Sequence, residues 1–235
     1  MKPVILIGGG RGHVRKGPDP LLQAAFLEAG GMRRPSIAYV GAASDDNRDF
    51  FKWIASLFRE AGSGAVRLGA MADAHADLDE ARTVLSDSDL VFVSGGDVEA
   101  GVRILRERSM VPFLKHLHAG GKPFFGISAG SIMLAQHWVS WPDPHDETRV
   151  ESFACMGFAP ILCDTHAEAE DWEELKALLK LSQRDTVGYG IPSGGALRVA
   201  SNGRVTALGK PACRFQFTEG AIRALPPLSP AVASV

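Results

Sequence analysis

Residues 121–134 read GKPFFGISAGSIML, a compact apolar run that ends at a serine set between small residues and then continues as helix-compatible sequence. The run over 123–127 predicts a buried strand, and the sequence from Ala129 onward predicts a helix. A direct passage from strand to helix needs a tight turn, which would expose Ser128 at its apex. The pentapeptide 126–130, GISAG, matches the G-x-S-x-G nucleophile-elbow pattern. The stretch predicts a serine nucleophile, although a glycine-rich helix start that only packs on a sheet would give the same match.

Composition excludes several classes of protein. The 235 residues are 46% hydrophobic and 22% charged, which is typical of an ordinary globular chain. A net charge of -2 gives no electrostatic case for nucleic-acid binding. No run approaches the roughly 20 apolar residues of a spanning helix, and MKPVILIGGG reads as a first strand rather than a signal peptide. The three cysteines lack C-x-x-C spacing, so we expect no disulfide framework, metal or cofactor, and a cytoplasmic location.

Short apolar runs alternate with helix-compatible segments along most of the chain. This pattern is typical of parallel βαβ units and predicts an α/β fold: a doubly wound, mostly parallel sheet with helices on both faces. After Thr186, short strands separated by glycine indicate a C-terminal antiparallel hairpin region joined to the sheet. We predict one α/β hydrolytic domain over 1–222 and a Pro/Ala-rich tail over 223–235, draped on the surface or disordered. Apolar strands are expected at 4–7, 36–41, 65–68, 89–94, 123–127 and 159–163, and a helix at 168–181.

In such sheets the ligand crevice lies beyond the carboxyl ends of the strands. Gly8, Gly41, Gly95 and Ser128 all follow predicted strands, so we expect them at one edge of the sheet. A glycine turn at 95–96 is explained by a need for positive φ, but its backbone N–H could also approach an oxyanion closely. At the elbow, the helix N-terminus makes the N–H after the serine available for the same purpose.

A serine needs a base to act as a nucleophile at neutral pH. His166 is the best of the seven histidines, because it follows an apolar run predicted as a buried strand on the sheet edge that carries Ser128. His137 and His145 are nearer in sequence, but His137 would lie at the far end of the helix that begins at the elbow. A structural histidine at a strand end is the alternative interpretation of His166.

The base in turn needs a group that orients it. Asp143 and Asp146 are the main candidates, because both lie in a segment with two prolines, 137–149, predicted to form a loop near the elbow. Asp164 and Glu168 rank behind them. Most acids in such loops are simply solvated, so the residues alone leave this position open.

Four segments taken together resemble peptidase family S51, the aspartyl dipeptidase and cyanophycinase group. They are YVGAAS, VFVSGGD, GKPFFGISAGSIML and ILCDTH, in this order and spacing. The resemblance covers about residues 4–199 and implies a class I glutamine amidotransferase-like fold. It also implies that Ser128 is the nucleophile and His166 the histidine, with an acid about fifteen to eighteen residues after the serine, a window that contains Asp143 and Asp146. Oxyanion donors would correspond to the backbone at Gly96 and Ala129.

Two departures from the family pattern leave the substrate open. The sequence after the histidine is HAEAEDWEEL rather than an aromatic residue and an arginine-rich segment, and GIPSGGAL has Pro192-Ser193 where family members often have an acid. We hypothesise that Glu168, Glu170 or Asp171 favours a cationic group such as a peptide N-terminus. The alternative is a helix start whose acids only offset the helix dipole.

The sequence thus predicts a serine-type peptidase that hydrolyses small peptides, dipeptidase-like or cyanophycinase-like, through a Ser-His-acid triad. Two rival interpretations are a catalytically silent amidotransferase-like domain that binds a metabolite or partner, and an α/β-hydrolase-type esterase. The esterase normally has its histidine near the end of the chain. We expect a small peptide substrate, no nucleic-acid or membrane partner, and leave a homodimer open.

Overall fold

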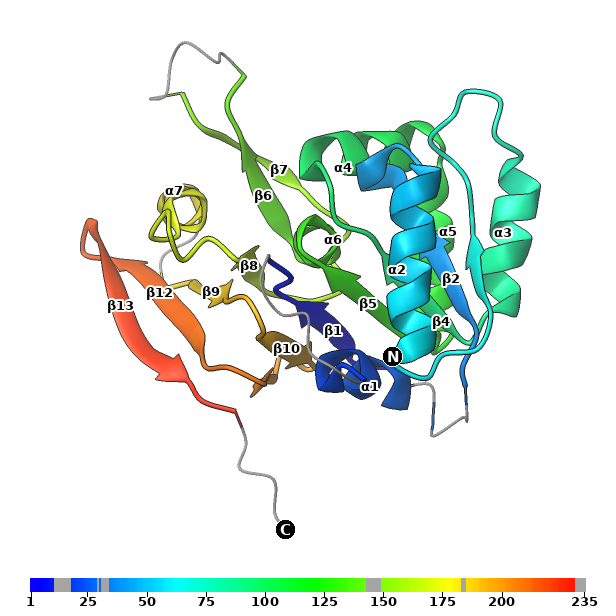
Figure 1. Cartoon of the computed structure of the whole chain (residues 1–235). Helices are drawn as coiled ribbons and strands as arrows, with labels where there is room; N and C mark the ends of the chain where they lie inside the picture. Colours follow the sequence, from blue (N-terminus) through cyan, green and yellow to red (C-terminus); the bar gives the residue numbers. More distant parts are fainter. Residues whose placement is uncertain (11–17, 29, 31–33, 143–148, 183–184, 231–235) are drawn as a thin grey trace.

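The computed structural model describes residues 1–10, 18–28, 30, 34–142, 149–182 and 185–230. A seven-stranded central sheet has the order β11-β10-β1-β5-β4-β2-β3 (Figure 1). Its five strands from β1 to β3 in this order are parallel, and β10 and β11 are antiparallel additions at one side. The strands are β1 (Val4–Ile7), β2 (Ile37–Val40), β3 (Val66–Leu68), β4 (Leu90–Val93), β5 (Phe124–Ile127), β10 (Ala196–Val199) and β11 (Val205–Leu208).

Continuous apolar strands form here because both faces of the sheet are covered. In β1, Val4 and Leu6 belong to the core cluster on one face, whereas Ile5 and Ile7 belong to the cluster on the other. Helices α1 and α2 contribute to the second cluster, and α3 to α6 to the first. The helices are α1 (Pro20–Leu27), α2 (Arg48–Glu60), α3 (Leu78–Asp87), α4 (Val98–Glu107), α5 (Met110–Ala119), α6 (Ala129–Leu134) and α7 (Glu173–Leu181), with the 3-10 helix η1 (Ala42–Ser44).

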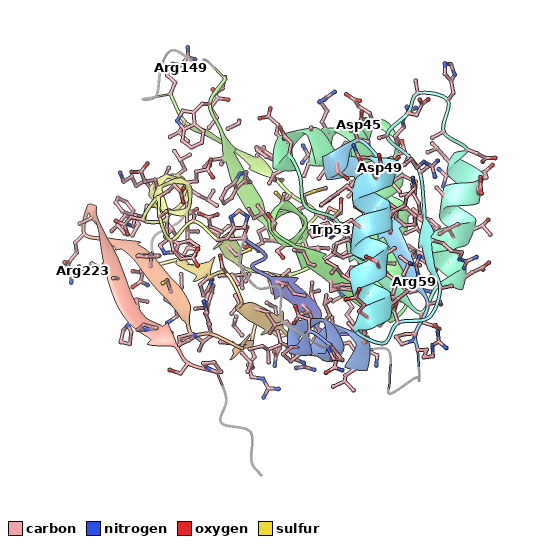
Figure 2. All side chains as sticks on the ribbon, in the orientation of Figure 1. Asp45, Asp49, Trp53, Arg59, Arg149 and Arg223 are labelled. Carbon is pink, nitrogen blue, oxygen red and sulfur yellow. The ribbon has the colours of Figure 1, made fainter. Side chains whose placement is uncertain are left out.

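Helix α2 shows how the outer surface differs from these cores. Its buried residues include Ile54 and Phe58, on the face turned to the sheet. Figure 2 shows Asp49, Trp53 and Arg59 along its outer side, and Trp53 is 55% exposed. The helix is therefore amphipathic and forms an outer layer of the fold.

A second sheet contains four strands in the order β13-β12-β9-β8, and Figure 1 shows β12 and β13 on the opposite side of the molecule from α3. Strand β8 pairs with β9 in parallel, and the other pairs are antiparallel. A separate hairpin, β6 paired with β7, follows α6. These strands are β6 (His137–Ser140), β7 (Glu151–Ala154), β8 (Leu162–Thr165), β9 (Val187–Ile191), β12 (Ala212–Thr218) and β13 (Ala221–Leu228).

The doubly wound sheet with helices on both faces and the antiparallel C-terminal strands are confirmed, and several details differ from the prediction. The strand before His166 is β8, which belongs to the second sheet rather than the central one. The segment at 137–149, predicted as a loop, begins with strand β6. Helix α7 begins at Glu173, five residues later than predicted.

The expected tail at 223–235 was wrong for residues 223–228, because the predicted boundary falls inside β13. Two prolines at 226–227 argued against a strand there. An edge strand needs only one side of its backbone for pairing, however, so β13 accommodates them. Residues 231–235 lie outside the described part of the chain.

Candidate active site

Ser128 forms the turn between β5 and α6, and its backbone has φ 56° and ψ -126°. A non-glycine residue in this conformation is strained and persists only when the surrounding structure fixes it. The N–H of Ser128 donates to the carbonyl of Ile7 (3.0 Å), and its own carbonyl accepts from the N–H of Ser131 (2.8 Å). The Ser131 hydroxyl also donates to the Ile7 carbonyl (2.9 Å). The turn is thus tied to both β1 and α6.

Two small residues beside the serine are required by close backbone packing. A Cβ at Gly126 would lie 2.5 Å from the carbonyl carbon of Gly130, and one at Gly130 would lie 2.0 Å from the carbonyl oxygen of Val93. Both distances are far inside van der Waals contact with backbone atoms that have little freedom to move. The glycines of the G-x-S-x-G pattern therefore let β5, α6 and β4 pack closely enough to form the elbow.

His166 lies directly after β8, and its Nε2 is 2.7 Å from Oγ of Ser128. Its backbone is held by the second sheet, because its N–H donates to the carbonyl of Ile191 (2.9 Å). Strand β8 packs against α6, the helix that starts at the serine, and Cys163 and Ser131 are in contact there. The structure therefore brings the predicted nucleophile and base into hydrogen-bond contact, although they come from different sheets.

The loop after β4 lies against the serine. A Cβ at Gly95 would be 3.3 Å from Cβ and 3.7 Å from Oγ of Ser128. Gly96 has φ 140°, and a Cβ there would lie 1.9 Å from the carbonyl oxygen of Ala43. Among the described residues, no acceptor takes a hydrogen bond from the N–H of Gly96 or Ala129. Within the described ranges, the N–H groups of both predicted oxyanion donors therefore have no acceptor.

The two acids predicted to orient the histidine, Asp143 and Asp146, lie outside the described residues. Within the described part of the chain, no carboxylate forms a hydrogen bond with His166. Of the two lower-ranked candidates, Glu168 accepts instead from the N–H of Ser193 (2.7 Å), and Asp164 is buried in β8, two residues before the histidine.

Asp164 is 2% exposed, and its Oδ1 accepts from the N–H of Thr165 (2.6 Å). Burial raises the pKa of this carboxyl group to about 7, and the nearby charges of Glu174 and Glu170 act in the same direction. The N–H groups of Thr165 and Leu175 oppose the shift. A strongly perturbed carboxyl group next to a candidate catalytic histidine marks a candidate functional position.

The predicted cation-binding acids lie on the exposed segment between His166 and α7. One oxygen of Glu168 is engaged by Ser193, as described above, and Glu170 is exposed. Asp171 forms an ion pair with Lys176 (2.7 Å). Glu168 and Glu170 therefore keep oxygen atoms available to solvent beside the histidine, whereas Asp171 is already paired.

Two further loops border the site. A Cβ at Gly9 would lie 3.3 Å from Cβ of Ser128, and one at Gly10 would lie 2.2 Å from Oγ of Ser193 and 3.3 Å from Cβ of His166. The loop after β1 and the turn at 192–195 therefore border the Ser128–His166 pair. The sequence predicted Gly8 at this edge of the sheet but not the contacts of Gly9 and Gly10. It marked Ser193 only as a departure from the family pattern, with no place in the site.

Other features of the described residues lie away from this site. His137, the rejected base, lines a separate cavity of about 350 Å³ with Leu162 and Leu178. No group of three His, Cys, Asp or Glu side chains in the described ranges could hold a metal ion. No described helix is long and apolar enough to cross a membrane.

One family model covers most of the chain, and two solved structures share its fold. The model of peptidase family S51 matches residues 4–206. The fold is similar to the crystal structure of a peptidase from an acI-B1 Actinobacterium, with a TM-score of 0.70 and 18% identity over 95% of this chain and 97% of that one. It is also similar to a putative peptidase E protein from Listeria monocytogenes EGD-e, with a TM-score of 0.64 and 17% identity over 89% of this chain and 98% of that one.

One curated relative matches a smaller part. The pyridoxal 5'-phosphate synthase subunit PdxT of Geobacillus sp. (strain WCH70) is 34% identical over 61 residues, which are 26% of this chain. The match spans about a third (32%) of the length of that relative, and we transfer no activity from it.

Proposed function

This chain belongs to peptidase family S51 and is a serine-type peptidase, and we propose that it hydrolyses small peptides with Ser128 as the nucleophile and His166 as the base. The observation that carries the proposal is the 2.7 Å contact between Ser128 Oγ and His166 Nε2 at a strained strand-to-helix turn. A nucleophile and base within hydrogen-bond reach are the geometric signature of covalent catalysis.

In the proposed reaction, Ser128 Oγ attacks the carbonyl carbon of the scissile peptide bond while His166 Nε2 takes its proton. The N–H groups of Gly96 and Ala129 stabilise the negative charge that develops on the carbonyl oxygen. His166 then gives the proton to the leaving amine as the C–N bond breaks, and an acyl-enzyme remains. Water, activated by the same histidine, hydrolyses the ester and regenerates Ser128.

The third member of the triad is proposed as Asp143, with Asp146 as its rival. Both remain proposals, since they lie outside the described residues. Asp164 and Glu168 are unsuited to this role in the described geometry, because neither forms a hydrogen bond with His166. Single Asp→Asn variants at 143 and 146 would separate the two, because loss of the orienting carboxylate lowers kcat by up to about 10⁴-fold.

For the substrate, we propose a short peptide whose cationic N-terminus lies near Glu168 and Glu170. The support is their exposed position on the segment that follows His166. Peptides with free and acetylated N-termini test this directly: preference for the free amine, lost in a Glu170→Gln variant, is expected. Equal cleavage of both peptide sets would remove the specificity proposal without affecting the nucleophile.

The central test is hydrolysis of a mixed dipeptide and short-peptide library, read by mass spectrometry. Ser128→Ala and His166→Ala should each lower cleavage by several orders of magnitude. Ser152→Ala, at an exposed serine on β7, is the matched control and should leave cleavage unchanged. Undiminished cleavage by Ser128→Ala would overturn the proposal.

The two rival interpretations were an α/β-hydrolase-type esterase and a catalytically silent binding domain. The esterase is not supported, because the family is S51. A His166 ring beyond reach of Ser128 would have favoured the silent binding domain, whereas the two side chains are in contact. The library experiment addresses it as well, since a silent domain would cleave nothing.

A further inference from the structure

Residues 94–97, here called the oxyanion loop, follow β4 and contain Gly96, one of the two proposed oxyanion donors. Two glycines in succession, Gly95 and Gly96, give a loop wide conformational freedom. A backbone N–H stabilises the developing negative charge only when it is held in place before the reaction. Contacts that fix this loop from outside are therefore needed for the proposed chemistry.

The end of the oxyanion loop is held against η1 by backbone contacts. The N–H of Asp97 donates to the carbonyl of Ala43 (2.8 Å). Gly96 packs so closely on the same carbonyl that a Cβ would lie 1.9 Å from its oxygen and 3.0 Å from N of Ser44. Helix α4, which follows the loop, also lies against η1, since a Cβ at Gly101 would be 2.9 Å from Cα of Ala43.

The beginning of the oxyanion loop is tied to η1 by two hydroxyl groups. Oγ of Ser94 lies 3.3 Å from Oγ of Ser44, the last residue of η1. The Ser44 hydroxyl also donates to the carbonyl of Gly41 (3.1 Å). A serine hydroxyl has a single proton, so Ser94 is the donor in its bond to Ser44. The two hydrogen bonds thus join the end of β4 to the end of β2 through Ser44.

Packing alone does not explain a serine at position 94. Ser94 is 0% exposed, and a buried hydroxyl destabilises a fold unless it has a hydrogen-bond partner. Its backbone N–H donates to the carbonyl of Val40 (3.0 Å), a bond that alanine would form equally well. What the hydroxyl adds is the bond to Ser44 on η1.

Helix η1 is itself fixed, so it can serve as a support. Figure 2 labels Asp45, the residue that directly follows η1, and Asp46 comes next. Oδ2 of Asp46 accepts from the N–H groups of Met71 (2.5 Å) and Ala72 (2.7 Å), in the connection from β3 to α3. The N–H of Asp46 donates to the carbonyl of Gly41 (3.0 Å). These bonds anchor η1 to two other parts of the central sheet region.

We propose that Ser44 is a positioning residue for the oxyanion donor Gly96. The hydroxyls of Ser44 and Ser94 tie the beginning of the oxyanion loop to η1, and the carbonyl of Ala43 ties its end. The N–H of Gly96, between these two attachments, is thereby held in one position. The proposal rests on the proposed function, in which this N–H stabilises the oxyanion, and it assigns Ser44 no contact with substrate.

The first test is kinetic and uses a peptide that the unmodified enzyme cleaves. Removal of a complete oxyanion donor costs about 10²- to 10³-fold in kcat, and here the donor is only loosened. Ser44→Ala should therefore lower kcat about tenfold, with KM changed less than about threefold. The matched control is Ser56→Ala, on α2, because the Ser56 hydroxyl also donates to a carbonyl three residues earlier, that of Trp53 (2.7 Å). The control should keep its kcat, and an unchanged kcat in Ser44→Ala would overturn the proposal.

A boronic acid analogue of the same peptide distinguishes positioning from a general loss of stability. Boron replaces the scissile carbonyl carbon and bonds to Oγ of Ser128 as the hydroxyl proton passes to His166, which gives a tetrahedral, negatively charged adduct. Its inhibition constant should rise about tenfold in Ser44→Ala, in step with the fall in kcat/KM, and stay unchanged in Ser56→Ala. A fall in kcat without any change in the affinity for the boronic acid would refute a role through the oxyanion donor.

The second hydroxyl provides an independent variant. Ser94→Ala should lower kcat by a similar or smaller factor than Ser44→Ala. Because Ser44→Ala leaves the Ser94 hydroxyl buried without its acceptor, adding Ser94→Ala should cause no further loss. A loss in the double variant equal to the product of the two single losses would contradict a shared bond. If Ser44→Ala does not fold, unchanged kcat and boronic acid affinity in Ser94→Ala would overturn the proposal instead.

Amide hydrogen exchange needs no turnover. The N–H of Asp97, bonded to the carbonyl of Ala43, should exchange about tenfold faster in Ser44→Ala than in the unmodified enzyme or in Ser56→Ala. Equal exchange in all three proteins would show that the loop does not depend on Ser44.

The two proposals fail in different ways. Full hydrolysis by Ser128→Ala would refute the catalytic assignment whatever the exchange rates show. If Ser128→Ala is inactive while Ser44→Ala keeps normal kcat and normal affinity for the boronic acid, the positioning role fails and the catalytic assignment stands.

Discussion

The serine elbow and the histidine loop, residues 166–172 between β8 and α7, each hold one reactive side chain on a strained backbone, but by different means. At the elbow, Ser128 is fixed by glycines two residues away on each side, which permit close backbone packing. In the histidine loop, three non-glycine residues have positive φ and contacts come from residues distant in sequence, such as Gly190 and Ser193. The elbow is therefore a local solution and the histidine loop a tertiary one.

Substitutions at the elbow and in the histidine loop should therefore affect different parts of the fold. The elbow is part of the central sheet, so a change there disturbs β4, β5 and α6 together. The histidine loop lies between the second sheet and α7, so a change there should affect the loop before it affects the central sheet. Four sets of variants test this difference, beginning with the one that should destabilise the protein most.

Gly130→Ala should have the largest effect. Its Cβ would lie 2.0 Å from the Val93 carbonyl oxygen and 2.7 Å from that of Ser94, and these backbone atoms have little freedom to move. We expect a loss of more than about 4 kcal/mol in the free energy of unfolding, enough to abolish folding of a marginally stable domain. Urea unfolding followed by circular dichroism checks this. Near-normal stability would mean that the elbow is less tightly packed than these distances imply.

Asp164→Asn tests whether the buried acid in β8, two residues before His166, makes stability depend on pH. The pKa of Asp164 is raised from 3.8 to about 7 in the folded protein, so between these values the folded state binds more protons than the unfolded state. Stability of the unmodified enzyme should therefore fall as pH rises through this window, because folding must bury an ionised carboxylate above about pH 7.

Asparagine removes that pH-dependent loss. The stability of Asp164→Asn relative to the unmodified enzyme should rise between pH 4 and pH 7 by on the order of 3–4 kcal/mol, the free energy of a pKa shift of about three units. Urea titrations at pH 4.5 and pH 8 measure the difference. A gap between the two proteins that is the same at both pH values would contradict the expectation.

Gly190→Ala should disturb the histidine loop and spare the elbow. Its Cβ would lie 2.6 Å from the Trp172 ring, and a side chain can move where the backbone near Gly130 cannot. We expect a stability loss of about 1–3 kcal/mol, typical of overpacking, with a fall in kcat of about tenfold or more as the loop shifts. Gly120→Ala, where φ is -71° and the Cβ would come no nearer than 3.4 Å to another atom, is a control for replacing a glycine without overpacking. Equal kcat losses in both variants would refute the loop argument.

Glu168→Ala should have the smallest effect, since it removes one hydrogen bond, to the N–H of Ser193, at an exposed position. A loss of about 1 kcal/mol or less is expected, with kcat lowered a few-fold. Glu168→Gln keeps an oxygen acceptor and should retain most of the activity. If glutamine proves as damaging as alanine, the charge of Glu168 acts on the substrate rather than on the Ser193 turn.

The sequence predicted much of the central sheet because its strands are short apolar runs with a helix between each pair. Val4–Ile7 is buried on both faces, so nothing in its pattern depended on knowing the partner strand. The position of β8 was wrong for the same reason: a buried strand of the second sheet, with Leu162 and Cys163 in the core, has the same apolar pattern as one of the first. Strand order depends on long-range pairing, which a local pattern does not record.

The local sequence was enough to predict the strand-to-helix turn and its candidate nucleophile. Gly126, Ser128 and Gly130 lie within five residues, so the steric requirements of the turn can be read from neighbouring positions. Long-range packing determines that His166 meets Ser128 from a second sheet, that Glu168 binds the Ser193 turn, and that Asp164 is buried in β8. The difference lies in how far apart along the chain the interacting residues are. Steric limits on the backbone act between neighbours in sequence, whereas burial, pKa shifts and hydrogen bonds between loops depend on which distant segments the fold brings together.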